Sequence, residues 1–480
     1  MKKEIFNNPV RVSPLGSGFF GLKNWIRSTG NPPREQLTLG TEMNPVLGQG
    51  LGVFNVMASK TPGNIDAEQG VVIGSISMGY GHYRMAIAMA SAVTRLGKIP
   101  YWLDLSSFGY TEGGRMIKNL EGLYSLGSRL SQQSEIFNRF FYEPFSARGF
   151  KKLDANLRDQ HSAALYSPIL RGLPRRIPFI ATHSWPAQGA LQAGMERVVN
   201  AVPDNWPLGM HLAEGALHTV QSPSAYFGYR TLRGMAGKKV LYPIPADEIF
   251  EVGHYVDHEL LKNLESDTLK RLQRIEDRGP FRLLISIGGA GAQEGLIGEI
   301  LKHLLPFLVA KKVVVFINVG YHRKVWEGFV KKEPRLRNLA REHFNTFDEV
   351  IALSREEAPV EGIRVFYHEN PFAAVYTTNL LMPVSDLLIT KPSELSYYPI
   401  PKLLIKRVGH HEAYGVIRSS ELGDGTIECV DLPHIFQMLD LILEEKDLLK
   451  LMNHHILRAK GAGVYDGAYK TVALALGEEF

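Results

Sequence analysis

The stretch VVIGSISMGYGH, residues 71–82, decides the fold of the first half of the chain. It opens with an apolar run that is typical of a buried strand, and its two glycines allow a tight turn directly after that strand. Apolar residues then recur at helical spacing from Met85 to Leu96, and Gly97 marks the end of the helix. A second apolar run follows at 99–103. The order strand, helix, strand predicts a βαβ unit with both strands parallel in one sheet.

The second half of the chain begins with the same pattern. FRLLISIGGAG, residues 281–291, is an apolar run followed by a glycine-rich turn, and an apolar helical stripe covers 296–304. Further strand candidates lie at 177–181, 197–202, 217–221, 239–242, 313–319, 365–367, 387–390 and 403–405. The sequence therefore predicts an α/β, GT-B-like fold class with two Rossmann-like doubly wound domains facing a cleft.

Changes in sequence character divide the chain into five predicted parts. Residues 1–70 are rich in Gly, Pro, Asn and Ser, so we expect an irregular N-terminal arm. Residues 71–256 and 280–460 hold the two domains, and the charged, helix-like stretch 257–279 is the predicted connector. We expect residues 461–480 to pack back on the first domain.

Composition limits the class of protein. The chain has 480 residues, of which 45% are hydrophobic, and this is enough for at least one large core. Its single cysteine, Cys429, excludes an internal disulfide, and no leading signal peptide or run of 18 to 20 apolar residues is present. We therefore expect a cytoplasmic protein whose membrane contact, if any, is peripheral. The segment 17–27 combines apolar and basic residues and suits a membrane surface or an arm docked on the core.

Neither nucleic acid nor a metal is an expected partner. The net charge of +5 suits anionic ligands, but the sequence has no long Lys/Arg block. Among the sixteen histidines, the adjacent pairs at 410–411 and 454–455 point apart. His254 and His258 stand one helical turn apart in the charged connector, where we expect them to be solvated.

His82 is the first residue that could carry chemistry. It would stand at the carboxyl edge of the first sheet, where such sheets bind ligands. The glycine turn and helix start before it would form a small anion site, or simply a tight turn with a histidine packed locally. A third glycine of the dinucleotide fingerprint is absent, so a bound NAD is not indicated.

Residues 77–82, SMGYGH, resemble the S-x-G-x-G-H opening of a group of GT-B glycosyltransferases. The group, family 28, includes monogalactosyldiacylglycerol synthases, processive diacylglycerol glucosyltransferases and the glucosaminyltransferase of peptidoglycan synthesis. Later segments are similar to its motifs in the same order: IATH at 180–183, the stretch 199–211, PIP at 243–245, DLLITKP at 386–392 and HHE at 410–412. The resemblance covers roughly residues 70 to 430, and DLLITKP is its most specific part.

This resemblance implies the residues of a donor site and an acceptor site. For the catalytic residues, the position of His82 after the glycine turn makes it our predicted general base, with Asp204 as an alternative base or as the partner that orients His82. Asp204 could equally cap a turn before Trp206. The implied donor-binding residues are Gly288, Gly289, Gly291, Lys391, Ser393, Glu394, His411 and Glu412. The implied acceptor-side residues are Gly79, Gly81, His183 and His211.

The sequence departs from the family pattern at two positions. The ribose-binding glutamate of the family falls on Pro399, so that contact is lost. Glu394, five residues earlier, is a candidate to bind a ribose hydroxyl instead, with a different placement. The sugar-facing glutamine of the family falls on His411, while Glu412 is kept.

The resemblance implies transfer of a hexose from a nucleotide-diphosphate sugar, a UDP-sugar first of all, to a lipid or other hydroxyl acceptor. No cofactor or metal is expected for this reaction. Two alternatives stay open, namely a non-catalytic nucleotide-sugar-binding protein on the same scaffold, and a GT-B nucleotide-sugar epimerase or hydrolase.

Overall fold

A computed structural model describes residues 4–10, 37–77, 79–119, 151–277, 279–288, 293–355 and 360–479. The chain forms two compact units. Unit 1 comprises Met1–His258 and Asp466–Phe480, and unit 2 comprises Glu259–Tyr465. Each unit is an α/β fold built on a parallel sheet, which confirms the predicted fold class of two Rossmann-like domains.

Unit 1 contains an eight-stranded sheet with the order β10-β9-β8-β7-β5-β6-β4-β3, in which only β3 is antiparallel to its neighbour. Its strands are β3 (Leu39–Met43), β4 (Phe54–Ala58), β5 (Gly70–Ser75), β6 (Ile99–Asp104), β7 (Phe179–Ala181), β8 (Val198–Ala201), β9 (Leu217–Val220) and β10 (Ile249–Glu251). A short hairpin pairs β1 (Glu4–Ile5) with β2 (Asn8–Pro9). The strand order reverses at β5, which has β6 on one side and β7 on the other.

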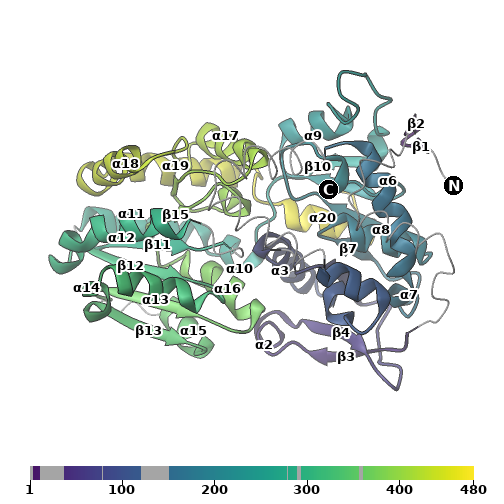
Figure 1. Cartoon of the computed structure of the whole chain (residues 1–480), viewed down its shortest axis with the longest axis horizontal. Helices are drawn as coiled ribbons and strands as arrows, with labels where there is room; N and C mark the ends of the chain where they lie inside the picture. The colour runs from purple at the N-terminus through teal and green to yellow at the C-terminus, as the bar shows by residue number, and fades with distance from the viewer. Residues whose placement is uncertain are drawn as a thin grey trace. The chain divides into compact units, whose positions relative to one another are not determined.

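Helices cover both faces of the unit 1 sheet. The helices are α2 (Gly48–Leu51), α3 (Tyr80–Arg95), α6 (Leu153–Ser162), α7 (Ser167–Leu170), α8 (Ser184–Gln192), α9 (Pro223–Arg230) and α20 (Gly467–Leu476), with 3₁₀ turns η2 (Leu105–Phe108), η5 (Ala163–Leu165), η6 (Gly209–His211) and η7 (Ala246–Glu248). One face packs on α7 and α8 through Val72, Leu103 and Phe179. On the opposite face α3 lies beside α20, the last helix of the chain (Figure 1).

Unit 2 contains a six-stranded, fully parallel sheet with the order β13-β14-β12-β11-β15-β16. Its strands are β11 (Phe281–Ser286), β12 (Val313–Asn318), β13 (Ala340–Phe344), β14 (Ile363–Tyr367), β15 (Leu387–Thr390) and β16 (Lys402–Leu404). Here the order reverses between β11 and β15, because β12 lies on the other side of β11. Side chains alternate between the two faces of the strands.

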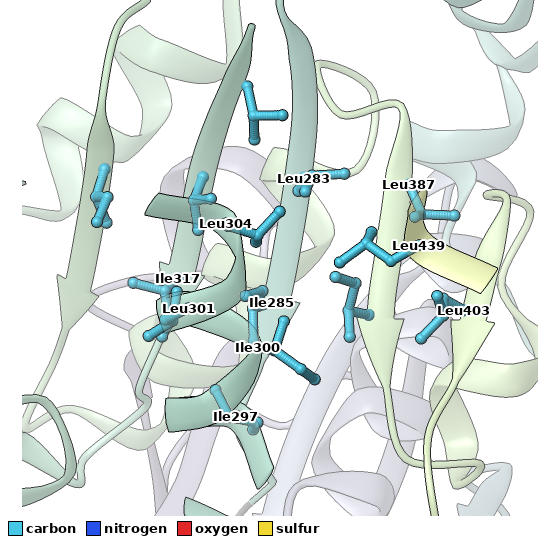
Figure 2. Close-up of a cluster of buried hydrophobic side chains, with 14 of the residues drawn as sticks. Leu283, Ile285, Ile297, Ile300, Leu301, Leu304, Ile317, Leu387, Leu403 and Leu439 are labelled. Atoms are coloured by element: carbon cyan, nitrogen blue, oxygen red, sulfur yellow. The ribbon is translucent and has the colours of Figure 1, made fainter. Parts of the chain in front are cut away.

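One face of this sheet forms the core drawn in Figure 2, where Ile285 and Leu387 of the sheet meet Ile300 of α12 (Glu294–Val309) and Leu439 of α18 (Leu432–Glu445). The other face packs on α16 (Pro371–Leu381). The remaining elements are α11 (Leu264–Glu276), α13 (Arg323–Lys332), α14 (Arg335–Asn338), α15 (Phe347–Arg355), η8 (Glu394–Tyr397), η9 (His410–Glu412), α17 (Ala413–Leu422) and α19 (Asp447–Gly461), while α10 (His258–Leu261) joins the two units.

Several sequence predictions are wrong in detail. Part of the predicted irregular arm, 1–70, is regular structure, because β3 and β4 extend the sheet of unit 1. The predicted strand at 239–242 is a loop in which Val240 and Tyr242 are exposed, and the strand in this region is β10. The predicted connector, 257–279, is mostly α11, which packs in unit 2. His254 is buried rather than solvated, and His258 contacts the Tyr469 hydroxyl.

The amino edge of the unit 2 sheet carries buried charges that are paired. Asp386 precedes β15, accepts hydrogen bonds from the Arg274 guanidinium at 2.8 and 3.0 Å, and accepts a third from the backbone N–H of Arg282 at 2.9 Å. Lys402 at the start of β16 is fully buried, and its ammonium contacts Asp424 at 2.9 Å and the carbonyls of Tyr398 and Ile400. These charges join the sheet to neighbouring segments.

We predict that Lys402→Met lowers the free energy of unfolding of unit 2 by about 3–5 kcal/mol, because it leaves the buried Asp424 carboxylate without its counter-charge. Urea unfolding followed by circular dichroism measures this loss. Lys311→Met is the matched control, since Lys311 pairs with Glu361 on the surface, and its effect should stay below about 1 kcal/mol. Equal effects of the two substitutions would contradict the structural role of Lys402.

Two buried histidines, His218 and His368, are held in the neutral form. His218 in β9 accepts a hydrogen bond at Nε2 from the Ala213 N–H and donates from Nδ1 to the Glu248 carbonyl, so the ring has no place for a second proton. Burial lowers the pKa of His218 to about 4. Burial, with a smaller contribution from His343, also lowers the pKa of His368 to about 4.

We therefore predict that the protein loses stability as the pH falls from about 6.5 towards 4. The unfolded histidine has a pKa of about 6.5 and binds protons in this window, whereas the folded one does not. For His218 the expected loss at pH 5 is roughly 2 kcal/mol, measured by urea unfolding at pH 7.5 and pH 5. His218→Gln should reduce this pH dependence, while His434→Gln on the surface should not. An unchanged pH dependence in His218→Gln would contradict the prediction.

No helix in the described ranges is both long and apolar enough to cross a membrane. The segment 17–27, which the sequence suggested for a membrane surface, lies outside the described residues.

Candidate functional site

The point where the strand order reverses in unit 1 brings His82 and His183 together. His82 lies in the first turn of α3, after β5, and His183 follows β7. The two rings are 4.9 Å apart in an edge-to-face arrangement, and His183 makes a similar contact with Trp185 at 4.7 Å. Such reversal points are where open α/β sheets bind ligands. The structure thus places both predicted histidines at the expected edge of the sheet.

A backbone carbonyl fixes the tautomer of His82. Its Nδ1 lies 2.6 Å from the carbonyl oxygen of Thr182, and a carbonyl can only accept a hydrogen bond. Nδ1 therefore carries the proton, and Nε2 of the neutral ring keeps its lone pair. This contact orients the His82 ring. The described contact of Asp204 is with His211, and its role as the orienting partner of His82 stays a prediction.

His183 has the opposite tautomer. Its Nδ1 accepts a hydrogen bond from the Trp185 N–H at 3.1 Å, which caps the start of α8, so the proton of the neutral ring is on Nε2. This Nε2 is buried and has no hydrogen-bond partner. Burial and the neighbouring His82 and His211 hold the pKa of His183 well below its usual value. The site thus contains a neutral Nε2–H donor on His183 beside the ring of His82.

Asp204 and His211 form a second pair beyond the carboxyl end of β8. His211 Nε2 lies 3.7 Å from Asp204 Oδ2, and His211 Nδ1 lies 2.8 Å from the Tyr229 hydroxyl. His211 is nearly buried, whereas the Asp204 side chain is 32% exposed. Sequence reasoning missed Tyr229, because nothing near it in the sequence marks a partner eighteen residues after His211.

The two predicted glycines of this site have different roles. Gly79 precedes α3 with a φ of +78°, a conformation that favours glycine, so it makes the turn between strand and helix. Gly81 lies within the first turn of α3. The sequence prediction of a turn that needs both glycines therefore holds for Gly79 only.

In unit 2 the reversal point lies between β11 and β15, and it carries Gly288 and Lys391. A Cβ atom at Gly288 would come within 3.2 Å of Lys391 Cε, so the lysine side chain lies directly over this glycine. The Lys391 ammonium pairs with Glu412 Oε1. A cation over an open backbone at this edge suits the phosphates of a nucleotide.

Glu412 holds this arrangement in place. Its Oε2 accepts hydrogen bonds from the N–H groups of Val408 at 2.7 Å and Gly409 at 3.3 Å. Burial alone would raise the pKa of the Glu412 carboxyl, but Lys391 and His411 outweigh it and lower this pKa. Because both carboxylate oxygens are engaged within the protein, Glu412 is suited to position Lys391 more than to receive sugar hydroxyls.

Of the other predicted donor residues, some lie among the described residues and some do not. Ser393 and Glu394 start η8 directly after Lys391, and His411 lies in η9 beside Glu412. Gly289 and Gly291 lie outside the described residues. Pro399 lines a small pocket with Arg271, Met382 and other residues that precede the sheet, and so belongs to its amino edge.

Within the described ranges, no group of three or more histidine, cysteine, aspartate or glutamate side chains is arranged to hold a metal ion. Residues that sequence reasoning missed include Asn200, a buried asparagine inside the apolar strand β8. A polar residue within such a run is a signal that could have been used, because buried amides need partners.

Two family models match the chain, each described as a domain of unknown function. DUF6937 matches residues 4–231 and DUF6938 matches residues 244–476. Comparison with curated protein sequences gives no match.

Among solved structures, the chain is similar to UDP-GlcNAc 2-epimerase from Neisseria meningitidis bound to UDP-GlcNAc, with 12% identity over 85% of this chain and 99% of that chain and a TM-score of 0.45. It is also similar to MnaA from S. aureus with UDP, with 11% identity over 86% of this chain and 100% of that chain and a TM-score of 0.42. A glycosyltransferase from Rickettsia africae shares 13% identity over 85% of this chain and 98% of that chain, with a TM-score of 0.38.

Proposed function

We propose that this protein is a glycosyltransferase of the GT-B type. It takes a hexose from a nucleotide-diphosphate sugar bound by unit 2, a UDP-sugar first of all, and transfers it to a hydroxyl acceptor bound by unit 1. A lipid acceptor at the inner face of a membrane belongs to this proposal.

The observation that carries the proposal is the contact between His82 Nδ1 and the Thr182 carbonyl, which orients the ring. A hydroxyl group becomes a nucleophile when a base removes its proton in the transition state. Because the Thr182 carbonyl accepts a hydrogen bond from Nδ1, a neutral His82 ring has its lone pair on Nε2, which is the tautomer that a general base needs. Its place at the reversal point of the unit 1 sheet puts this base where such sheets bind ligands.

The donor side is supported by Lys391. A leaving nucleoside diphosphate develops negative charge, and a fixed cation stabilises this charge without having to reorganise. Lys391 is 21% exposed, lies over Gly288 and is paired with Glu412, so its ammonium is both held and reachable. Ser393 and the start of η8 would add hydrogen-bond donors on the same side.

A second candidate function is a non-catalytic nucleotide-sugar-binding protein. It is favoured by Pro399, which stands where the resembled family has its ribose-binding glutamate and which lines a pocket at the amino edge of the unit 2 sheet. Both candidate functions require the protein to bind the donor. Only the glycosyltransferase consumes it.

We predict that His82→Ala lowers the rate of sugar transfer by about 100-fold or more, because it removes the general base. Donor binding should remain, since His82 belongs to unit 1. The measurement is release of nucleoside diphosphate together with a thermal-shift assay of the donor. His434→Ala on the surface of α18 is the control and should keep full activity. Full activity of His82→Ala would remove His82 from the mechanism.

We predict that the nucleoside diphosphate of the true donor, tested among UDP, GDP, dTDP and CDP, stabilises the protein by about 2.7 kcal/mol at 100 times its Kd. The double substitution Lys391→Met with Glu412→Gln should abolish this response, because it removes the phosphate-facing cation without leaving an unpaired buried carboxylate. Lys311→Met with Glu361→Gln is the matched surface control. An unchanged response in the first double variant would contradict the donor site.

A further inference from the structure

Helix α9 and the loop that follows it expose large apolar side chains on unit 1. Within the described ranges, three of the five most exposed large apolar side chains lie here, namely Val240 at 91%, Tyr242 at 68% and Phe227 at 66%. Phe227 belongs to α9, and the other two lie in the loop between α9 and β10. A single exposed apolar side chain needs no explanation, but several in one small region indicate a contact surface.

Hydrogen bonds hold this loop at two points. The Arg230 guanidinium donates to the Ile244 carbonyl, and the Ile244 N–H donates to the Arg230 carbonyl at 3.0 Å, so the loop is joined to the end of α9. The Asn8 side chain in β2 donates to the Tyr242 carbonyl at 3.0 Å and accepts from the Tyr242 N–H at 2.8 Å. The exposure of Tyr242 is therefore part of an ordered backbone conformation.

The loop has an inner and an outer face. Leu241 and Ile244 are buried in one core cluster, whereas Val240 and Tyr242 are exposed. Residues three apart on a helix share a face, so Phe227 lies on the side of α9 that carries residue 230, to which the loop is joined. Phe227, Val240 and Tyr242 together are called the apolar patch below.

The sequence around the apolar patch is basic. Residues 215–246 contain four arginine and lysine residues and no aspartate or glutamate. Lys238 and Lys239, directly before Val240, are exposed, and so is Arg233. Adjacent positive charge and apolar surface suit a partner that offers anionic groups beside an apolar layer.

We propose that the apolar patch docks unit 1 on a bilayer that contains anionic lipids. Lys238 and Lys239 contact the phosphate headgroups, while the three apolar side chains enter the boundary between headgroups and acyl chains, where tyrosine is commonly found. The surface deepens the proposed function, because it brings a lipid acceptor to unit 1. Binding to the bilayer itself needs no sugar transfer.

The first test is co-sedimentation of the full chain with vesicles. We expect binding to vesicles of phosphatidylcholine and phosphatidylglycerol in equal parts, and little binding to phosphatidylcholine alone. Val240→Ser with Tyr242→Ser should lower the affinity for the mixed vesicles by about tenfold or more, because it removes the apolar area that is buried on docking. Val309→Ser with Ile427→Ser, at comparably exposed positions of unit 2, is the matched control and should bind like the wild type.

The second test removes the positive charge. Lys238→Gln with Lys239→Gln should lower the affinity for the mixed vesicles by about 30-fold, since each lysine near an anionic membrane surface contributes about a factor of five. Lys331→Gln with Lys332→Gln, exposed at the end of α13, makes the same change in net charge and should have little effect. Thermal unfolding of all four variants should match the wild type, because every substituted side chain is exposed.

Three results would overturn the proposal. They are the absence of binding to the mixed vesicles, equal losses in the patch variants and their controls, and binding that needs the lysines but not Val240 and Tyr242. The last result would indicate a soluble polyanion, such as a nucleic acid or an acidic protein, as the partner. Vesicle binding without any sugar transfer would leave this surface standing and count against the transferase function. Transfer to a soluble acceptor without vesicle binding would do the reverse.

Discussion

Parallel pairing of strands that are buried on both faces is the constraint on which both units depend. Packing covers both faces of each strand, so a polar side chain inside a strand is enclosed by the protein, and polar side chains that a ligand can reach gather at the two edges where the strands begin and end. The same pairing places all carboxyl ends at one edge. In unit 1 this edge receives His82 and His183, and in unit 2 it receives Gly288 and Lys391. Both pairs lie where the strand order reverses.

The two edges of the unit 2 sheet use charge in different ways. At the amino edge, Lys402 and Asp386 have their hydrogen bonds satisfied within the protein, which stabilises the fold and leaves nothing for a ligand. At the carboxyl edge, Lys391 remains partly exposed although Glu412 holds it. In unit 1 the buried Nε2 of His183 keeps an unused donor. Polar groups with unused capacity are what distinguishes a candidate site from a structural network.

The sequence predicts the centre of each sheet better than its margins. Apolar runs such as those of β5 and β11 identify strands because both faces are buried, whereas β13, with its charged residues, has the composition of a surface loop and was missed. The loop at 239–242 looked like a strand, yet Val240 and Tyr242 are exposed. For the site, topology fixes which edge His82 occupies. Its contact with the Thr182 carbonyl joins residues one hundred positions apart, and no local pattern shows it.

We propose that a histidine in unit 1, His82, and a fixed cation in unit 2, Lys391, serve one transfer reaction. Release of nucleoside diphosphate from UDP-, GDP- and dTDP-sugars, with detergent-dispersed lipids and neutral glycosides as acceptors, tests it most directly in the wild type, in His82→Ala and in Lys391→Met with Glu412→Gln. The account predicts release from one donor that depends on an acceptor and is lost in both variants. Release that persists in both variants, or its complete absence in a wild type that binds the donor, would contradict it.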